Sequence, residues 1–340
     1  MTNILELKDV NVSFTVESNS LHILRDVSLE IPKGSFLCVV GESGCGKSVT
    51  AQAIVQLLPD NGRIDSGSIY FYDNDERLEV NKLEKFGSRM RGLRGAKIGM
   101  IFQDTLSSLN PAHKVGRQVT ETLRQHLDLS KAEAKERVIQ LFKKLGIPDP
   151  ERRYEAYPHE FSGGMRQRVM IAIATACEPD LVIADEPTTA LDVTIQAQIM
   201  SLLKDLQKSA GKTFILITHN MALVSEVADH VAVMYLGRVV EYGTVEQVLR
   251  QPKHPYTKAL LKSVPSLDAD KSLELLTVDG QTPSPAEVTK GCEFAGRCSY
   301  VTNECRNETI SLQTYENSHQ VRCNQLDKNG NLPLRRGEND

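Results

Sequence analysis

The sequence predicts an α/β fold in which a mostly parallel sheet carries helices on both of its faces. A glycine-rich octapeptide at 41–48 joins the apolar run 36–40 to a stretch of helical character. A second unbroken apolar run, 181–184, ends on two acidic residues, and helix-like and strand-like segments alternate from there to residue 242. Unbroken apolar strands that alternate with helices are typical of parallel sheets covered on both sides.

The first hundred residues supply most of the other strands. Residues 4 to about 40 alternate between apolar and polar side chains and carry a turn signal at 32–34, which is a pattern of short strands. Further strands are expected at 67–72 and at 96–102, and the second of these ends directly before Gln103. This part of the chain is therefore predicted to be mostly strand, apart from the helix that follows the octapeptide.

The middle of the chain is predicted to be helical. Ser130 and Glu133 form a capping-box pattern, in which the hydroxyl and the carboxylate each bind a free backbone N–H group of the first turn. Apolar residues then recur at helical spacing until Gly146 and Pro148 end the helix. A second helix is expected at about 162–177.

The alternation of strand and helix continues in the second half. The run 181–184 is expected to be a buried strand, and Gly237 is expected to turn a hairpin. In chain order, the pattern predicts a helix at about 193–209 and strands at 213–217, 230–235 and 238–242. This order of elements favours a sheet wound with helices on both faces.

Length, charge and composition limit the kind of protein. The chain has 340 residues, enough for two domains, and its net charge of −4 gives no sign of nucleic-acid binding. No apolar run approaches the roughly 18 residues that span a bilayer. The first residues also lack the basic and apolar parts of a signal peptide. We therefore expect a cytoplasmic protein that reaches a membrane only through a partner.

The character of the sequence changes after about residue 250. Prolines recur there, and four of the seven cysteines fall in the last fifty residues. We therefore expect a first domain at 1–250, a small second domain at 251–323, and a flexible polar tail at 324–340.

The octapeptide fits the pattern G-x-x-x-x-G-K-[ST] at every fixed position. In this pattern, backbone N–H groups and a helix N-terminus surround phosphate oxygens, Lys47 neutralises phosphate charge and the Ser48 hydroxyl binds Mg²⁺. A chance glycine turn is the alternative, but the strand before it and the helix after it favour a nucleoside triphosphate site. The candidate phosphate-binding residues are Gly41, Ser43, Gly44, Cys45, Gly46, Lys47, Ser48 and Val49.

Two carboxylates directly follow the strand 181–184. Ligands of α/β sheets bind at the carboxyl ends of the strands, so Asp185 is expected to hold Mg²⁺ through water. Glu186 is expected to orient and deprotonate the attacking water. The alternative is that the acidic pair only caps the next helix, but the phosphate-binding pattern earlier in the chain favours the catalytic interpretation.

A second anion-binding pattern lies at Ser162, Gly163 and Gly164, at the predicted start of a helix. The alternative is a helix cap that binds no ligand. One chain does not need two such helix ends for one triphosphate, which indicates that the second end serves another molecule.

Over residues 5 to about 245, these motifs and their order resemble the nucleotide-binding subunits of ABC transporters. The resemblance implies a P-loop NTPase fold with a RecA-like core, an antiparallel β-subdomain and an inserted helical subdomain at about 105–178. It also implies ATP and Mg²⁺ as cofactors, with ATP held between two subunits that close on each other.

The same resemblance assigns roles around the subunit's own nucleotide. Gln103 matches the Q-loop glutamine, which joins Ser48 and Asp185 at Mg²⁺. His219 matches the switch histidine that contacts the γ-phosphate. Phe14 lies where the family places an aromatic ring on adenine, although a lone aromatic residue in a strand can equally belong to the core.

Two further motifs of the family concern the opposite subunit. Asp192 matches the D-loop. The signature that faces the ATP of the partner subunit matches Ser162, Gly163, Gly164 and Met165.

The resemblance narrows to the oligopeptide and dipeptide importers. The stretches 157–168, 185–192 and 254–257 are similar to the forms found in that branch. Phe161 and Met165 depart from the broad ABC pattern, but both are common among peptide importers. An ABC ATPase that acts on DNA would contain a long coiled coil, and one that acts on ribosomes would contain a second cassette; neither fits this sequence. A sensor that only binds nucleotide would lack Glu186 or His219, and both are present.

The narrower resemblance implies an ATP-hydrolysing subunit on the cytoplasmic face of the membrane. Its expected partners are a second, similar but distinct ATPase subunit, two transmembrane permease subunits and an extracytoplasmic substrate-binding protein. The segment 104–111 is expected to lie by the groove that docks the permeases. Members of this branch import dipeptides, oligopeptides, nickel chelates or oligosaccharides, so the cargo stays open.

The remaining candidate site is a cysteine cluster at Cys292, Cys298, Cys305 and Cys323. In a reducing compartment such a cluster indicates a metal more than disulfides. Zinc sites usually contain C-x₂₋₄-C pairs, and this spacing has none. The stretch 292–298 also resembles the C-terminal element of dipeptide importers, some of which carry a [4Fe-4S] cluster. We therefore expect that cluster, with zinc second and with unligated thiols or two disulfides as the remaining alternative.

Overall fold

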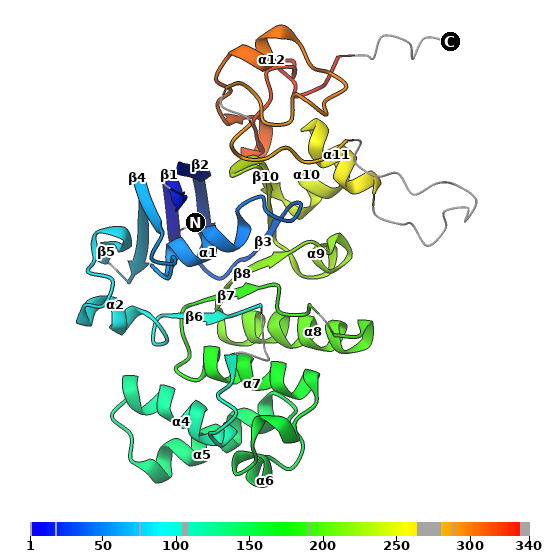
Figure 1. Ribbon diagram of the computed structural model, residues 1–340. Helices are drawn as coiled ribbons and strands as arrows, with labels where there is room; N and C mark the ends of the chain where they lie inside the picture. Colours follow the sequence, from blue (N-terminus) through cyan, green and yellow to red (C-terminus); the bar gives the residue numbers. More distant parts are fainter. Residues whose placement is uncertain are drawn as a thin grey trace.

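The computed structural model describes residues 2–17, 19–74, 76–103, 108–189, 191–263, 280–287 and 290–333. Two sheets, a group of helices and an irregular C-terminal segment make up this part of the chain (Figure 1). None of its helices combines the length and the apolar character that crossing a membrane requires.

An eight-stranded sheet forms the centre of the molecule, in the order β11-β12-β10-β9-β3-β8-β7-β6. The five strands from β9 to β6 run parallel, and β10, β12 and β11 continue the sheet in antiparallel pairing. The strands are β3 (Phe36–Val40), β6 (Ile98–Ile101), β7 (Leu181–Asp185), β8 (Thr213–Thr218), β9 (His230–Tyr235), β10 (Arg238–Thr244), β11 (Gln313–Thr314) and β12 (Gln320–Val321). The predicted α/β fold with a parallel sheet is confirmed.

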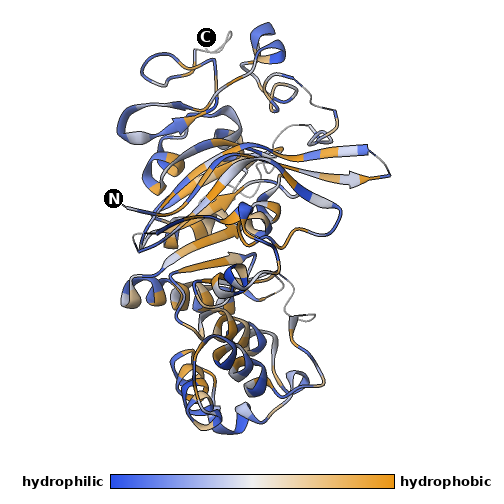
Figure 2. Ribbon diagram, turned by 90° about the vertical axis from the view of Figure 1, so that its left-hand side faces the viewer, coloured by the Kyte–Doolittle hydropathy of each residue, from blue (hydrophilic) through white to orange (hydrophobic). Residues whose placement is uncertain are grey.

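Both faces of this sheet are buried, as its unbroken apolar strands require. In β3, Phe36, Cys38 and Val40 belong to one apolar core, whereas Leu37 and Val39 belong to another on the opposite face. The first core lies under α7 (Gly163–Thr175), α8 (Val193–Ala210) and α9 (Met221–Val227). Figure 2 shows apolar residues concentrated on the strands and on the helices that pack against them.

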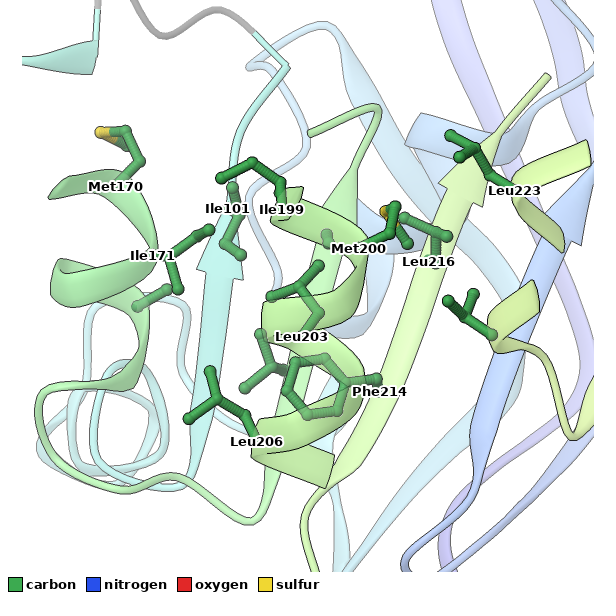
Figure 3. Close-up of a cluster of buried hydrophobic side chains, with 14 of the residues drawn as sticks. Ile101, Met170, Ile171, Ile199, Met200, Leu203, Leu206, Phe214, Leu216 and Leu223 are labelled. Carbon is green, nitrogen blue, oxygen red and sulfur yellow. The ribbon is translucent and has the colours of Figure 1, made fainter. Parts of the chain in front are cut away.

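Helix α8 illustrates this packing. Leu203 and Leu206 of α8 lie with Phe214 and Leu216 of β8 in the first core, next to Ile171 of α7 (Figure 3). These side chains are nearly or fully removed from solvent. The helix was expected at about 193–209, and it spans Val193–Ala210.

The second core joins the central sheet to an antiparallel sheet of the order β2-β1-β4-β5. Its strands are β1 (Asn3–Val16), β2 (Asn19–Pro32), β4 (Gly62–Asp73) and β5 (Glu76–Glu79), and α1 (Lys47–Ile54) and α2 (Ser88–Leu93) pack beside it. The strands expected as short pieces are thus two long ones. Register shifts, such as the one between Leu7 and Val10, let each long strand bend without ending.

A helical group lies at the other end of the molecule, in the lower part of Figure 1. It contains α4 (Val115–His126), α5 (Lys131–Lys144), α6 (Pro150–Tyr154) and α7. The predicted capping box is present: Glu133 N–H donates to Ser130 Oγ at 3.3 Å, and Ser130 N–H donates to the Glu133 carboxylate at 2.9 Å. The short 3₁₀ helices are Val80–Lys82, Pro158–Glu160 and Glu316–Ser318.

The C-terminal segment packs against the central sheet. It begins with α10 (Val245–Arg250) and α11 (Pro255–Lys262), and after residue 280 it is mostly irregular apart from α12 (Asn303–Asn307), β11 and β12. Because β12 pairs with β10, the sheet runs without a break into this segment. Part of the expected tail, 334–340, lies outside the described residues.

Candidate functional site

The octapeptide forms a tight loop between β3 and α1. Gly41 and Gly46 have φ of +153° and +102°, a region that only glycine occupies without strain. A Cβ on Gly41 would lie 2.2 Å from the Met234 carbonyl oxygen, and one on Gly46 would lie 2.7 Å from Leu24 Cδ2. These two glycines are therefore required by the backbone path and by the close packing of the loop.

Lys47 lies across this loop with only 6% of its surface exposed. Its ammonium group donates hydrogen bonds to the carbonyl oxygens of Gly41 and Glu42, each at 2.9 Å. Helix α1 begins at Lys47, and among the described residues no side chain caps its N-terminus. The loop thus combines a cation with free helix N–H groups, which is the arrangement that binds phosphate.

The hydroxyl of Ser48 and the carboxylate of Asp185 meet beside the loop. Ser48 Oγ donates to Asp185 Oδ1 at 2.9 Å, and Asp185 is 5% exposed. Burial raises the pKa of the Asp185 carboxyl. A hydroxyl and a carboxylate next to a phosphate site are the oxygen ligands that Mg²⁺ accepts, so these residues fit that ion.

Three side chains converge on the Glu186 carboxylate. Gln103 Nε2 donates to Oε2 at 3.1 Å, Thr189 Oγ1 donates to the same oxygen at 3.0 Å, and His219 Nδ1 lies 3.3 Å from Oε1. Glu186 itself has φ of +44°, and its N–H donates to the Ile217 carbonyl oxygen. The residues predicted from three distant motifs are therefore brought together at one carboxylate, and Thr189 is a contact that the sequence did not indicate.

An open cleft of about 430 Å³ runs from the loop along the antiparallel sheet. Its size and its mixed apolar and polar walls are typical of a small-ligand site. It includes most of the predicted ATP-binding residues, whereas Gly41 and the buried Cys45 do not line it. The lining residues are Phe14, Val16, Leu21, Ile23, Ser43, Gly44, Gly46, Lys47, Ser48, Val49, Gln103 and Glu186.

The apolar wall of the cleft comes from the ends of β1 and β2. The ring of Phe14 lies over Gly62, where a Cβ would approach the ring to 2.9 Å, so the ring is fixed at the edge of the cleft. Val16, Leu21 and Ile23 were not among the predicted residues. In the sequence, only their place as apolar side chains near strand ends could have indicated that they line a cleft.

The signature and D-loop residues do not line this cleft. Ser162 caps α7, with Met165 N–H donating to its Oγ at 3.4 Å. Asp192 caps α8 by accepting from Ile195 N–H at 2.9 Å. The two motifs pack on each other, because a Cβ on Gly164 would approach Ile195 to 2.9 Å. Ala190, the first residue of the predicted D-loop, lies outside the described residues.

The predicted four-cysteine metal site is not borne out as a ligand set. Within the described ranges, no group of three or more His, Cys, Asp or Glu side chains is placed to hold a metal ion. Two of the thiols contact polar groups of the protein: Cys298 Sγ accepts from Tyr300 N–H at 3.4 Å, and Cys305 Sγ lies 3.4 Å from Thr302 Oγ1. Burial raises the pKa of the Cys292 thiol to about 12.

Comparison with known proteins agrees with the geometry. Residues 24–189 match the family described as "ABC transporter", and residues 240–305 match "Oligopeptide/dipeptide transporter, C-terminal region". The dipeptide transport ATP-binding protein DppD of Bacillus subtilis is 46% identical over 95% of each chain. The oligopeptide transport ATP-binding protein OppD of the same organism is 50% identical over 88% of this chain and 82% of its own length.

A solved structure shares the fold of the cassette. The dimeric, post-hydrolysis structure of the ATP-binding cassette MJ0796, bound to ADP and Pi, has a TM-score of 0.63 at 29% identity. It covers 71% of this chain and 98% of its own. The phosphate loop, the converging Glu186 site and these similarities together show that the chain is an ATPase, and that it belongs to the ABC transporter family as an ATP-binding protein of the oligopeptide/dipeptide importer branch.

Proposed function

We propose that this chain hydrolyses ATP in the cleft beside the phosphate loop to power the import of peptides. The observation that carries the proposal is the convergence of Gln103, Thr189 and His219 on Glu186, next to the Ser48–Asp185 pair. Such a group is suited to hydrolysis, because it combines a phosphate cradle with a carboxylate that can accept the proton of water.

Each residue has a distinct part in the reaction. Lys47 neutralises the phosphate charge, and Ser48, Gln103 and Asp185 would hold Mg²⁺, which would supply charge neutralisation at the phosphates. Gln103 and His219 orient the Glu186 carboxylate toward the γ-phosphate end of the cleft. Glu186 then aligns a water molecule for attack and takes its proton, and Phe14 forms the adenine end of the cleft.

A second ATPase subunit completes the site. Ser162, Gly163, Gly164 and Met165 begin a helix whose N-terminus is suited to an anion, but they do not line the cleft of their own chain. We propose that they contact ATP held by a similar but distinct partner subunit, with Asp192 at the same interface. The dimeric state given for the MJ0796 structure supports this arrangement.

The remaining partners follow from the branch of the family. We propose two transmembrane permease subunits, which dock near Gln103 and the helical group, and an extracytoplasmic substrate-binding protein that delivers the cargo. The chain would then lie on the cytoplasmic face of the membrane. The expected docking segment 104–111 lies partly outside the described residues, since 104–107 are not described.

Dipeptides or oligopeptides are the proposed cargo, because the relatives are described as dipeptide and oligopeptide transport proteins. Nickel chelates and oligosaccharides are the alternatives within this branch. Purification of the complete transporter and mass spectrometry of its co-purified ligand would identify the cargo. A bound peptide is expected, and a metal chelate or a sugar would overturn this assignment.

We also propose that the four C-terminal cysteines hold a [4Fe-4S] cluster, with zinc as the alternative. In support, Cys292 N–H donates to the Cys305 carbonyl oxygen at 2.7 Å, which brings these two cysteines close together. A cluster would cross-link an irregular segment that has little core of its own.

The metal content of the protein tests this proposal. Protein purified without oxygen should be brown and contain about four irons per chain. Replacing Cys298 with Ser should remove the colour. One zinc per chain would favour the alternative, and metal-free protein with an equally ordered C-terminal segment would exclude both.

The Glu186→Gln variant tests the catalytic assignment. The amide keeps the size and most hydrogen bonds of Glu186 but cannot accept the proton, so hydrolysis by the assembled transporter should fall by at least about a hundredfold. ATP binding should remain. Glu226→Gln, on the exposed side of α9, is the matched control and should hydrolyse ATP normally. Hydrolysis by Glu186→Gln within a few fold of wild type would remove Glu186 as the base.

A further inference from the structure

The C-terminal segment contacts the phosphate loop directly, at Glu42. Arg297 forms a bidentate ion pair with this carboxylate: Nη1 donates to Oε2 at 2.8 Å and Nη2 donates to Oε1 at 3.0 Å. Thr282 Oγ1 donates to Oε2 at 2.5 Å. On the other side of the residue, Glu42 N–H donates to the Tyr256 hydroxyl at 3.0 Å. Residues far along the chain therefore hold both the side chain and the backbone of one loop residue.

The guanidinium of Arg297 is fixed in this position. Its side chain is only 6% exposed, and Nη1 also donates to the Tyr235 hydroxyl at 3.3 Å. The ring centres of Tyr235 and Phe294 each lie 5.8 Å from its central carbon. A buried, stacked and bidentate arginine is held far more firmly than a surface ion pair.

The Glu42 side chain carries a negative charge within the phosphate loop. The carboxylate belongs to the octapeptide that receives a triphosphate, and its own carbonyl oxygen accepts from Lys47 Nζ. An uncompensated negative charge here would repel phosphate and would compete for Lys47. Burial alone would raise the pKa of the Glu42 carboxyl, but the hydrogen bonds from Arg297 and Thr282 hold it below its usual value. The residue is thus charged, and Arg297 neutralises it.

We propose that Arg297 is a positioning residue for ATP binding, which keeps the Glu42 carboxylate neutralised and directed away from the triphosphate. Through this contact the cysteine-bearing C-terminal segment sets the ATP affinity of the cassette. Arg297 directly precedes Cys298, so its ion pair with Glu42 links the cysteine region to the phosphate loop.

The alternative is that the ion pair only anchors the C-terminal segment. The two explanations differ for paired substitutions. If Arg297 acts by neutralising Glu42, then removing the charge of Glu42 should relieve the loss of Arg297. If the pair is only an anchor, the double variant should be at least as impaired as the single one.

Binding of Mg·ATP to the full-length chain, measured by fluorescence titration, tests the proposal. Arg297→Gln should raise the Kd for Mg·ATP about tenfold, which corresponds to about 1.4 kcal/mol. The reason is that the Glu42 carboxylate loses its ion pair and its negative charge then repels the phosphates. Arg297→Lys should raise Kd less, since it keeps the charge and loses the bidentate geometry. Glu42→Gln, alone or combined with Arg297→Gln, should stay within about threefold of wild type.

Lys253→Ala is the matched control. The Lys253 ammonium group also stabilises the C-terminal segment, because it donates hydrogen bonds to the carbonyl oxygens of Asn329 and Gly330 at 3.1 and 3.3 Å. These contacts do not involve the phosphate loop. This variant should bind ATP normally. An equal loss in Lys253→Ala would assign the effect to general loosening of the segment and overturn the proposal.

Two further results would overturn it. One is an Arg297→Gln variant that binds ATP within twofold of wild type, and the other is a double variant no better than Arg297→Gln. Should Arg297→Gln not fold, the comparison of Arg297→Lys with Arg297→Lys plus Glu42→Gln decides in the same way. The inference rests on the proposed binding of ATP at the loop, and the two can fail separately. Wild-type protein that binds no ATP would refute the nucleotide site itself, whereas the results above would refute only the role of Arg297.

Discussion

His254 is a buried histidine whose protonation should destabilise the folded chain. It precedes α11 and is 1% exposed. The ring nitrogen Nδ1 accepts a hydrogen bond from the backbone N–H of Tyr256 at 3.1 Å. The backbone N–H of His254 donates to the Glu241 carboxylate at 3.0 Å. Burial lowers the pKa of His254 to about 4, against an opposing effect of Glu241, while the charge of Arg322 acts in the same direction as burial. The ring is therefore neutral in the folded protein at neutral pH and acts as a hydrogen-bond acceptor.

The size of the effect follows from the two pKa values. The pKa of an ordinary histidine is 6.5, and that of His254 in the folded chain is about 4, so the two differ by about 2.5. Each unit of pKa difference corresponds to about 1.4 kcal/mol. Between these values the unfolded chain binds a proton that the folded chain does not, so the free energy of unfolding falls as pH falls. The full loss is about 3 kcal/mol by pH 4, and about 2 kcal/mol of it should occur between pH 7.5 and pH 5.

Urea unfolding of wild type and His254→Asn at pH 7.5 and pH 5 measures this loss. Asparagine keeps an acceptor for the first turn of α11 but does not titrate. Its drop in unfolding free energy over this interval should therefore be smaller than that of wild type by about 2 kcal/mol. His22→Asn, at an exposed histidine, should behave like wild type. Equal drops in wild type and His254→Asn would refute the reasoning.

Three other substitutions test the fold and the site. Gly41→Ala places a Cβ 2.2 Å from the Met234 carbonyl oxygen, so it should abolish ATP binding and lower Tm, whereas near-normal binding would mean that the loop opens easily. Ser162→Arg should leave ATP binding to the isolated chain intact and block ATP-dependent pairing in light scattering, and an equal loss of affinity in the monomer would contradict the assignment to the partner's site. Leu203→Ala removes a fully buried side chain and should lower the urea-unfolding free energy by about 2–5 kcal/mol, while a change below about 1 kcal/mol would show that the core refills the space.

Much of the fold and of the ATP site could be predicted because local patterns determine them. The loop at Gly41–Ser48 is made largely of backbone, so its glycines and its lysine carry the information in eight consecutive residues. The strand β7 is an unbroken apolar run, and its end places Asp185 at the sheet edge where ligands bind. The capping box at Ser130 likewise needs only four residues to identify the start of α5.

Other features depend on partners that no local pattern identifies. Glu42 and Arg297 lie 255 residues apart, and neither stands out from the other charged residues of the chain. The antiparallel strands β11 and β12 have two residues each, too few for any periodicity. The cysteine spacing predicted a metal site, yet some of the thiols have protein hydrogen-bond partners instead, as at Cys298 and Cys305.

The C-terminal segment was expected to be a small second domain, and ion pairs from Glu293 and Arg297 join it to the cassette. Arg238 pairs with both Asp26 and Glu293, so the antiparallel sheet, the central sheet and the C-terminal segment meet at one partly buried guanidinium. Glu293 follows Cys292, just as Arg297 precedes Cys298. Each of these two cysteines is therefore next to a charged residue that forms an ion pair with the cassette. These two ion pairs connect the cysteine region to Arg238 in the central sheet and to Glu42 in the phosphate loop.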